Sequence, residues 1–283
     1  FRQTVQSKQL KKGRSDMKLS FSTLGCPSWS LDEVFSAAKD LGFDGVEIRG
    51  ISDKIYVPDF EAFKDENLQK TKNAITKINL KIPVLDSGAV IADHDKAQNS
   101  FAEACDYINL ASKLGVKYVR VMGTGEPQVT DGNFERAAQL YGLLCEYASI
   151  FGVTPLIETN GKLADSKEMI KLMEQSGNKN CGVVWDVHHT VRFASETPEQ
   201  TAKELGSLIK HVHLKDSVVS NGNIEYKMMG YGDMPIKKTI EALREIDFDG
   251  FVSLEWVKRW KPDLQEPGIV FAHFASYMRA LLN

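Results

Sequence analysis

The chain has 283 residues, of which 42% are hydrophobic and 26% are charged, and its formal net charge is −3. These proportions are ordinary for a globular protein, so they exclude collagen-like, disordered and coiled-coil chains. The slightly acidic balance argues against nucleic acid as a partner, because proteins that bind nucleic acid expose basic surfaces. No run of about 18 apolar residues marks a membrane span, so we expect no membrane partner either.

The first 16 residues, FRQTVQSKQLKKGRSD, are basic and polar and start with Phe rather than Met. They contain no apolar segment of the kind that a signal peptide needs. We expect residues 1–16 to be a poorly ordered extension, either native or left from a trimmed precursor, and residues 17–283 to form one catalytic domain. The compartment stays open: the cytoplasm is favoured, and export after removal of a signal segment is the alternative.

From residue 17 onward, short apolar runs alternate with longer segments of helical period. The runs are rich in Val, Ile and Leu and are bounded by turn residues, which is typical of buried strands. They predict eight strands, at residues 18–21, 45–48, 80–85, 116–122, 153–158, 182–186, 209–214 and 251–256.

The segments between these strands have the features of amphipathic helices. In the first segment, apolar residues recur at i, i+3, i+4 and i+7 from Leu31, and Ser30 and Glu33 have the spacing of a capping box. Eight strand–helix units in about 265 residues predict an α/β fold, a single (β/α)8 TIM barrel. An open doubly wound sheet is the alternative, but STLGCPSWS after the first strand lacks the GxGxxG phosphate turn.

Four polar residues stand at the ends of the last four predicted strands: Glu158, Asp186, His213 and Glu255. Because the carboxyl ends of barrel strands meet at one rim, we expect these side chains to converge. Three carboxylates and one imidazole suit a divalent cation, Mn²⁺ first, with Mg²⁺, Co²⁺ or Zn²⁺ as alternatives. Each carboxylate alone could instead cap the next helix. His211 shares a strand face with His213 and is the alternative ligand.

The motifs resemble those of the xylose isomerase-like, endonuclease IV-like barrels, specifically the sugar phosphate isomerase/epimerase branch. The resemblance covers residues 17–283 and rests on E-T-N, D-x-x-H, H-x-H-L-K-D and L-E-W after or on the last four predicted strands. It implies one metal ion held by Glu158, Asp186, His213 and Glu255, with His213 favoured over His211. It also implies that His189 contacts the substrate or a second metal.

The resemblance further implies the chemistry. In this family the metal polarises a substrate carbonyl, a carboxylate removes the adjacent carbon-bound proton, and a metal-bound enediolate forms. Glu158 and Glu255 are similar to the acid/base pair. We therefore expect an isomerase or epimerase of a sugar or keto-polyol. A lyase on the same site, inosose dehydratase-like or eliminating from a 3-keto-glycoside, is the first alternative; an endonuclease IV-like nuclease and a non-catalytic sugar-binding barrel follow.

Further side chains are expected to contact a sugar or cyclitol substrate. They lie at the earlier strand ends, in nearby loops and after the last two strands: Glu47, Arg49, Asp86, His94, Lys215 and Trp256. A rim salt bridge is the alternative for Arg49, and a solvated loop position is the alternative for His94. Arg120, inside a predicted strand, needs a buried partner, and Glu158 is the expected one.

Two departures from the family pattern bear on the substrate. The ketose 3-epimerases of the family carry an Arg six residues after the metal His, where this chain has Val219. This weakens a free-ketose 3-epimerase assignment, while G-x-G-D-x-P after the seventh strand resembles the broader isomerase/epimerase and inosose dehydratase-like members. No Gly-rich anion nest requires a phosphorylated substrate. Residues 256–268 could form a lid or the interface of a homodimer.

Overall fold

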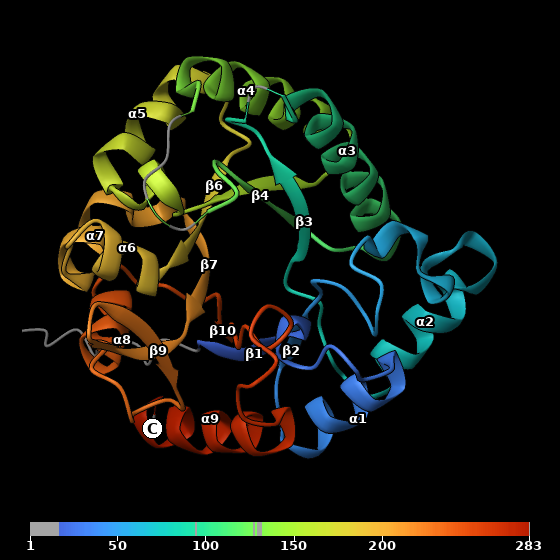
Figure 1. The fold of residues 1–283 in the computed structure, drawn as a ribbon. Helices are drawn as coiled ribbons and strands as arrows, with labels where there is room; N and C mark the ends of the chain where they lie inside the picture. The colour runs from blue at the N-terminus through green and yellow to red at the C-terminus, as the bar shows by residue number, and fades with distance from the viewer. Residues whose placement is uncertain (1–16, 94, 127, 129–131, 283) are drawn as a thin grey trace, which may run out of the picture.

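The structure is a computed structural model that describes residues 17–93, 95–126, 128 and 132–282. The expected extension 1–16 and the candidate His94 lie outside the described residues. Eight parallel strands curl into a barrel, and the helices form a ring outside them (Figure 1). The sheet order is β2-β1-β10-β7-β6-β5-β4-β3. Isolated bridges Gly45↔Lys81 and Ile48↔Leu85 join its two outer strands. The predicted TIM barrel is therefore confirmed.

The barrel strands and the helices alternate along the chain. The strands are β1 (Lys18–Ser22), β2 (Gly45–Glu47), β3 (Leu85–Val90), β4 (Tyr118–Met122), β5 (Thr154–Glu158), β6 (Gly182–Asp186), β7 (Ile209–Leu214) and β10 (Phe251–Leu254). The helices are α1 (Leu31–Asp40), α2 (Asp65–Lys77), α3 (Ala97–Leu114), α4 (Phe134–Ile150), α5 (Ser166–Ser176), α6 (Val187–Phe193), α7 (Pro198–Leu205), α8 (Ile236–Glu245) and α9 (Pro267–Leu282). No helix among the described residues is long and apolar enough to cross a membrane.

The predicted third strand is wrong in position. Residues 80–84 make only an isolated bridge to β2, and the strand β3 begins at Leu85. Pro83 has no N–H to give to a ladder, which explains why regular pairing starts after it. Asp86, predicted at the end of this strand, is instead its second residue and lies deep in the barrel.

An antiparallel hairpin that the sequence analysis treated as a loop follows β7. Its strands are β8 (Asp216–Ser220) and β9 (Asn223–Lys227), joined by Asn221 and Gly222, whose φ angles are 50° and 78°. Asn-Gly between two strands is the strongest local signal for such a turn, because both positions require positive φ. The signal was present in the sequence.

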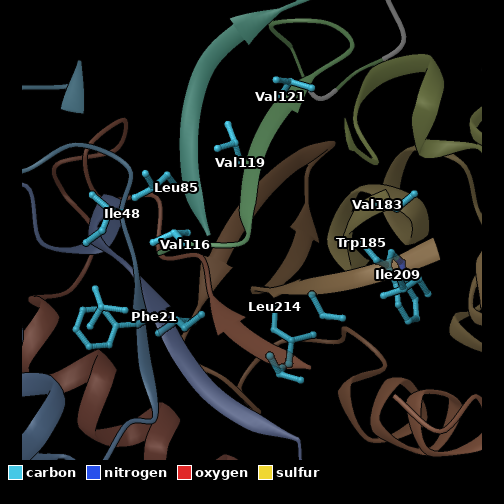
Figure 2. Packing of buried hydrophobic residues seen from close by; sticks show 14 of the residues in the cluster. Phe21, Ile48, Leu85, Val116, Val119, Val121, Val183, Trp185, Ile209 and Leu214 are labelled. Carbon is cyan, nitrogen blue, oxygen red and sulfur yellow. The ribbon is translucent and has the colours of Figure 1, made fainter. Parts of the chain in front are cut away.

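The strands separate an apolar layer from a polar barrel interior. Figure 2 shows Val119 and Val121 on β4 and Val183 and Trp185 on β6, all part of the hydrophobic core between strands and helices. Strand side chains alternate between faces, so their neighbours point inward. Many inward positions carry polar groups: Ser20, Glu47, Asp86, Arg120, Glu158, Asp186, His211, His213 and Ser253 are all buried. Barrel interiors are usually filled by Val, Ile and Leu. This interior differs, because many of its inward positions carry polar or charged side chains.

Candidate metal and substrate site

The four predicted ligands meet at the carboxyl-terminal end of the barrel. Glu158 ends β5, Asp186 ends β6, His213 pairs with Asp186 across the β6–β7 ladder, and Glu255 follows β10. Each offers one potential ligand atom, these atoms all lie within 4.8 Å of one another, and all four side chains are buried. The structure therefore brings the predicted set together, and its role as a ligand set stays a prediction.

The ring of His213 has one occupied and one free nitrogen. Its Nε2 lies 3.0 Å from Oε2 of Glu47. Its buried Nδ1 has no hydrogen-bond partner among the described residues, and it lies 3.6 Å from Oε1 of Glu255 and 4.0 Å from Oδ2 of Asp186. The free nitrogen thus faces the carboxylates of the cluster.

His211, the alternative ligand, lies on the other side of the same Glu47 oxygen. Its Nε2 is 2.7 Å from Oε2 of Glu47. It also lines a cavity of about 580 Å³ at the opposite, amino-terminal mouth of the barrel. This geometry favours His213 over His211 as the ligand.

Two cations tie the carboxylates in place. Nη1 of Arg120 donates to Oε2 of Glu158 at 2.9 Å, which confirms the predicted pair. The Lys215 ammonium donates to both Asp186 and Glu255. Lys215 was expected to contact substrate, and the structure places it within the cluster itself, with 2% of its side chain exposed.

The surroundings shift the pKa values of the two expected acid/base carboxyls in opposite directions. Burial raises the pKa of Glu158, and the Arg120 charge only partly opposes this. Burial acts in the same direction on Glu255, but Lys215 and His213 outweigh it and lower the pKa of that carboxyl. Two carboxyls driven apart in this way are typical of sites that need one acid and one base.

His189, predicted to contact the substrate or a second metal, lies beside the carboxylates of the cluster. It is near the start of α6, where Asp186 caps the helix by accepting from the His189 N–H at 3.0 Å. Its Nδ1 is 3.0 Å from the Thr159 carbonyl oxygen and 3.5 Å from carboxylate oxygens of both Glu158 and Asp186.

Four other residues that we expected to contact substrate have different partners. Glu47 and Asp86 are fully buried: Oε2 of Glu47 faces both His211 and His213, and Oδ1 of Asp86 lies 3.6 Å from Nε of Arg120. Burial and the nearby Glu47 charge raise the pKa of Asp86 well above its usual range. Arg49 donates to the Ile55 carbonyl at 3.3 Å, and Trp256 is 1% exposed, with its indole N–H donating to the Gln265 carbonyl at 3.0 Å. Contact of these four residues with a substrate stays a prediction.

β9 brings Tyr226 to the site, a residue that the sequence motifs did not single out. Its half-buried ring lies 5.5 Å from the His188 ring, and the Lys261 ammonium lies 5.8 Å from its centroid. Burial raises the pKa of its phenol, and the charges of Lys215, Glu255 and Asp186 act on it as well. The overlooked Asn-Gly turn would have placed this residue on a hairpin next to the site.

Asp216 holds the loop that follows the hairpin. Its carboxylate accepts backbone N–H groups from Gly230, Gly232 and Met234 at 2.8 to 3.2 Å. The G-x-G-D-x-P segment is therefore anchored to the residue that directly follows Lys215. The hairpin also carries Val219, whose side chain is exposed where the ketose epimerases have Arg.

Comparison with known proteins supports the fold over nearly the whole chain. A family model described as xylose isomerase-like TIM barrel matches residues 35–274. Fructoselysine 3-epimerase of Shigella flexneri is 19% identical over 278 residues, which cover 94% of this chain and 98% of that protein. A zinc-bound IOLI protein has a TM-score of 0.76 at 21% identity, covering 94% and 98% of the two chains. The probable 3-DHS dehydratase AsbF of Bacillus anthracis has a TM-score of 0.76 at 16% identity, covering 93% and 99%.

Proposed function

The chain belongs to the xylose isomerase-like TIM barrel family, and we propose that it is a divalent-metal-dependent isomerase or epimerase acting on a sugar or keto-polyol. The observation that carries the proposal is the buried convergence of Glu158, Asp186, His213 and Glu255. The similarity of the chain to a protein named fructoselysine 3-epimerase supports this reaction class. Mn²⁺ is the first ion to test.

The donor set fits a divalent cation. His213 presents a buried nitrogen that no described residue satisfies, and the three carboxylates surround it. In the described part of the site, the cations of Arg120 and Lys215 pair with Glu158, Asp186 and Glu255, and all five side chains are buried. Buried charge is costly unless it is paired, so a cation held by the three carboxylates would add to this pairing. The oxygen-rich set with one imidazole suits Mn²⁺, Mg²⁺, Co²⁺ or Zn²⁺.

A bound ion would supply Lewis acidity, which polarises a carbonyl and acidifies the carbon-bound proton beside it. Glu158 and Glu255 perform the proton transfers in this proposal, because they are carboxylates that reach the site from separate strands. One removes the proton to form an enediolate. Return of a proton to the opposite face epimerises the carbon, and return to the neighbouring carbon isomerises the sugar.

The remaining residues orient these groups. Arg120 holds one oxygen of Glu158, and Lys215 bridges Asp186 and Glu255. His189, whose Nδ1 faces the Thr159 carbonyl oxygen, is the proposed contact for a substrate hydroxyl. Each anchor limits the rotamers of a reacting side chain, which is the positioning that such chemistry requires.

A lyase acting through the same enediolate is the second candidate. Val219 stands where the family's ketose 3-epimerases place an Arg, and its side chain is 53% exposed on the hairpin. The fold neighbours include a protein titled as a probable 3-DHS dehydratase. In a lyase, Glu158 and Glu255 would divide the work differently: one would remove the proton and the other would protonate the departing hydroxyl or aglycone.

The test is deuterium exchange in D₂O with metal-stripped protein, before and after reloading with Mn²⁺. Ketoses, inososes and 3-keto glycosides are incubated, quenched, freed of metal and examined by NMR and mass spectrometry. We expect deuterium beside a carbonyl only in the reloaded sample. The product mass then separates isomerisation from loss of water or aglycone. Tight metal binding without exchange in any compound would contradict proton transfer and favour a sugar-binding barrel.

A further inference from the structure

We propose that Glu47 is a positioning residue, which selects the nitrogen that His213 presents to the metal; this inference rests on the proposed metal site. Glu47 is the last residue of β2 and is fully buried. Two strands, β1 and β10, separate β2 from β7 in the sheet order. The Glu47 side chain therefore reaches across the barrel interior to a residue 166 positions away.

One of the two ring nitrogens of His213 has a partner among the described residues, and the other has none. Oε2 of Glu47 lies 3.0 Å from Nε2 of His213, whereas Nδ1 of the same ring has no partner among the described residues. That free nitrogen lies nearest to Glu255, at 3.6 Å from its Oε1. The occupied edge of the imidazole faces Glu47, and the free edge faces Glu255 and Asp186.

The chemistry of a carboxylate explains the selection. An ionised carboxylate only accepts hydrogen bonds, so the ring nitrogen facing it must carry the proton. In a neutral imidazole the other nitrogen then holds the lone pair that a metal needs. Metal-bound histidines commonly have such a carboxylate or carbonyl behind them, and its loss lowers metal affinity about 10- to 100-fold. An amide in the same place could donate instead and would permit the wrong tautomer.

His211 fixes Glu47 in turn. Its Nε2 lies 2.7 Å from the same oxygen that meets His213, and the two imidazole rings are perpendicular, with centroids 5.3 Å apart. Two donors on one oxygen restrict the rotation of the carboxylate. The H-x-H spacing on β7 is explained by this arrangement: one histidine faces the proposed metal, and the other holds the group behind it.

The experiment compares metal binding by the wild-type protein, Glu47→Gln and Glu196→Gln. Glu196 is the matched control, because its buried carboxylate accepts from Ser166 at 2.8 Å and Thr201 at 2.5 Å, outside the cluster. We expect Glu47→Gln to weaken Co²⁺ and Zn²⁺ binding about 10- to 100-fold and to change the visible spectrum of bound Co²⁺. Glu196→Gln should lose thermal stability but keep the affinity and the spectrum.

The wild-type protein gives a second measurement, which does not depend on a variant that folds. In the Zn²⁺-loaded protein, ¹⁵N NMR should show His213 protonated at Nε2 and metal-bound at Nδ1. Binding through Nε2, or equal affinity and spectra for wild type and Glu47→Gln, overturns the positioning role alone. A wild-type protein that binds none of these ions overturns the proposed function, and the present inference with it.

Discussion

At the residue scale, the site is a set of carboxylates whose separate neighbours give them different properties. Lys215 contacts Asp186 and Glu255, whereas Arg120 contacts Glu158. Chemically similar groups are thereby differentiated by position: the pKa of Glu255 is lowered and that of Glu158 is raised. Such differentiation allows one enediolate site to contain both an acid and a base.

Glu255→Gln should abolish turnover and leave the barrel folded. The amide keeps the size of the side chain, and its oxygen can still accept from Lys215, but it cannot take up a proton. General acid–base catalysis contributes about 10²- to 10⁴-fold, so kcat should fall by at least that lower factor. The measurement is kcat on the substrate found by deuterium exchange, with circular dichroism to verify folding. Glu204→Gln, an exposed position on α7, is the control, and full activity of Glu255→Gln would refute the proton-transfer role.

At the element scale, local rules predicted some segments and failed at others. The capping box forms as expected: the Ser30 N–H donates to Glu33 at 2.7 Å, and Ser30 accepts from the Glu33 N–H at 3.3 Å. The stripe that starts at Leu31 is buried along α1. By contrast, the strand predicted at residues 80–85, which includes Pro83, begins only at Leu85, because composition alone does not show which backbone N–H groups find a partner.

The hairpin β8–β9 gives a test at this scale. Gly222 has a φ of 78° in the turn, a conformation that costs a residue with Cβ about 1 kcal/mol or more. Gly222→Ala should therefore loosen the hairpin that carries Tyr226, without disturbing the barrel. Hydrogen exchange should speed up for the amides of β8 and β9 and stay unchanged in β4 to β7. Val219→Thr, exposed on the same hairpin, should leave exchange as in the wild type. Unchanged protection in Gly222→Ala would show that the turn does not depend on glycine.

At the scale of the whole molecule, the barrel architecture determines which distant residues meet. The sequence was sufficient to predict the eight-strand barrel and the meeting of Glu158, Asp186, His213 and Glu255, because strand ends in a barrel share one rim. It did not predict that Glu47 lies behind His213, since that contact depends on how far a side chain reaches across the interior. Lys215 was placed at the site, but its bridge between two carboxylates depends on the same three-dimensional detail.

A polar barrel interior should make the stability of the whole protein depend on metal. A ligand that binds only the folded state stabilises it by about 2.7 kcal/mol at a concentration of 100 times Kd, which for a chain of this size corresponds to a Tm increase of about 5 °C. We expect Mn²⁺ to raise Tm and a chelator to reverse the effect, as measured by calorimetry.

The matched variant for this last prediction is Asp186→Asn. Asp186 caps α6 through its Oδ1, which accepts from the His189 N–H at 3.0 Å, and an Asn oxygen can accept the same bond. The variant should keep the helix cap and remove one negative charge from the proposed ligand set. Its amide NH2 then faces the Lys215 ammonium in place of the accepting oxygen, so the Mn²⁺ response of each protein is measured against its own metal-free Tm. With that charge removed, the Tm of the variant should respond to Mn²⁺ far less than that of the wild type. An equal Mn²⁺ response in both proteins would place the stabilising ion somewhere other than this cluster.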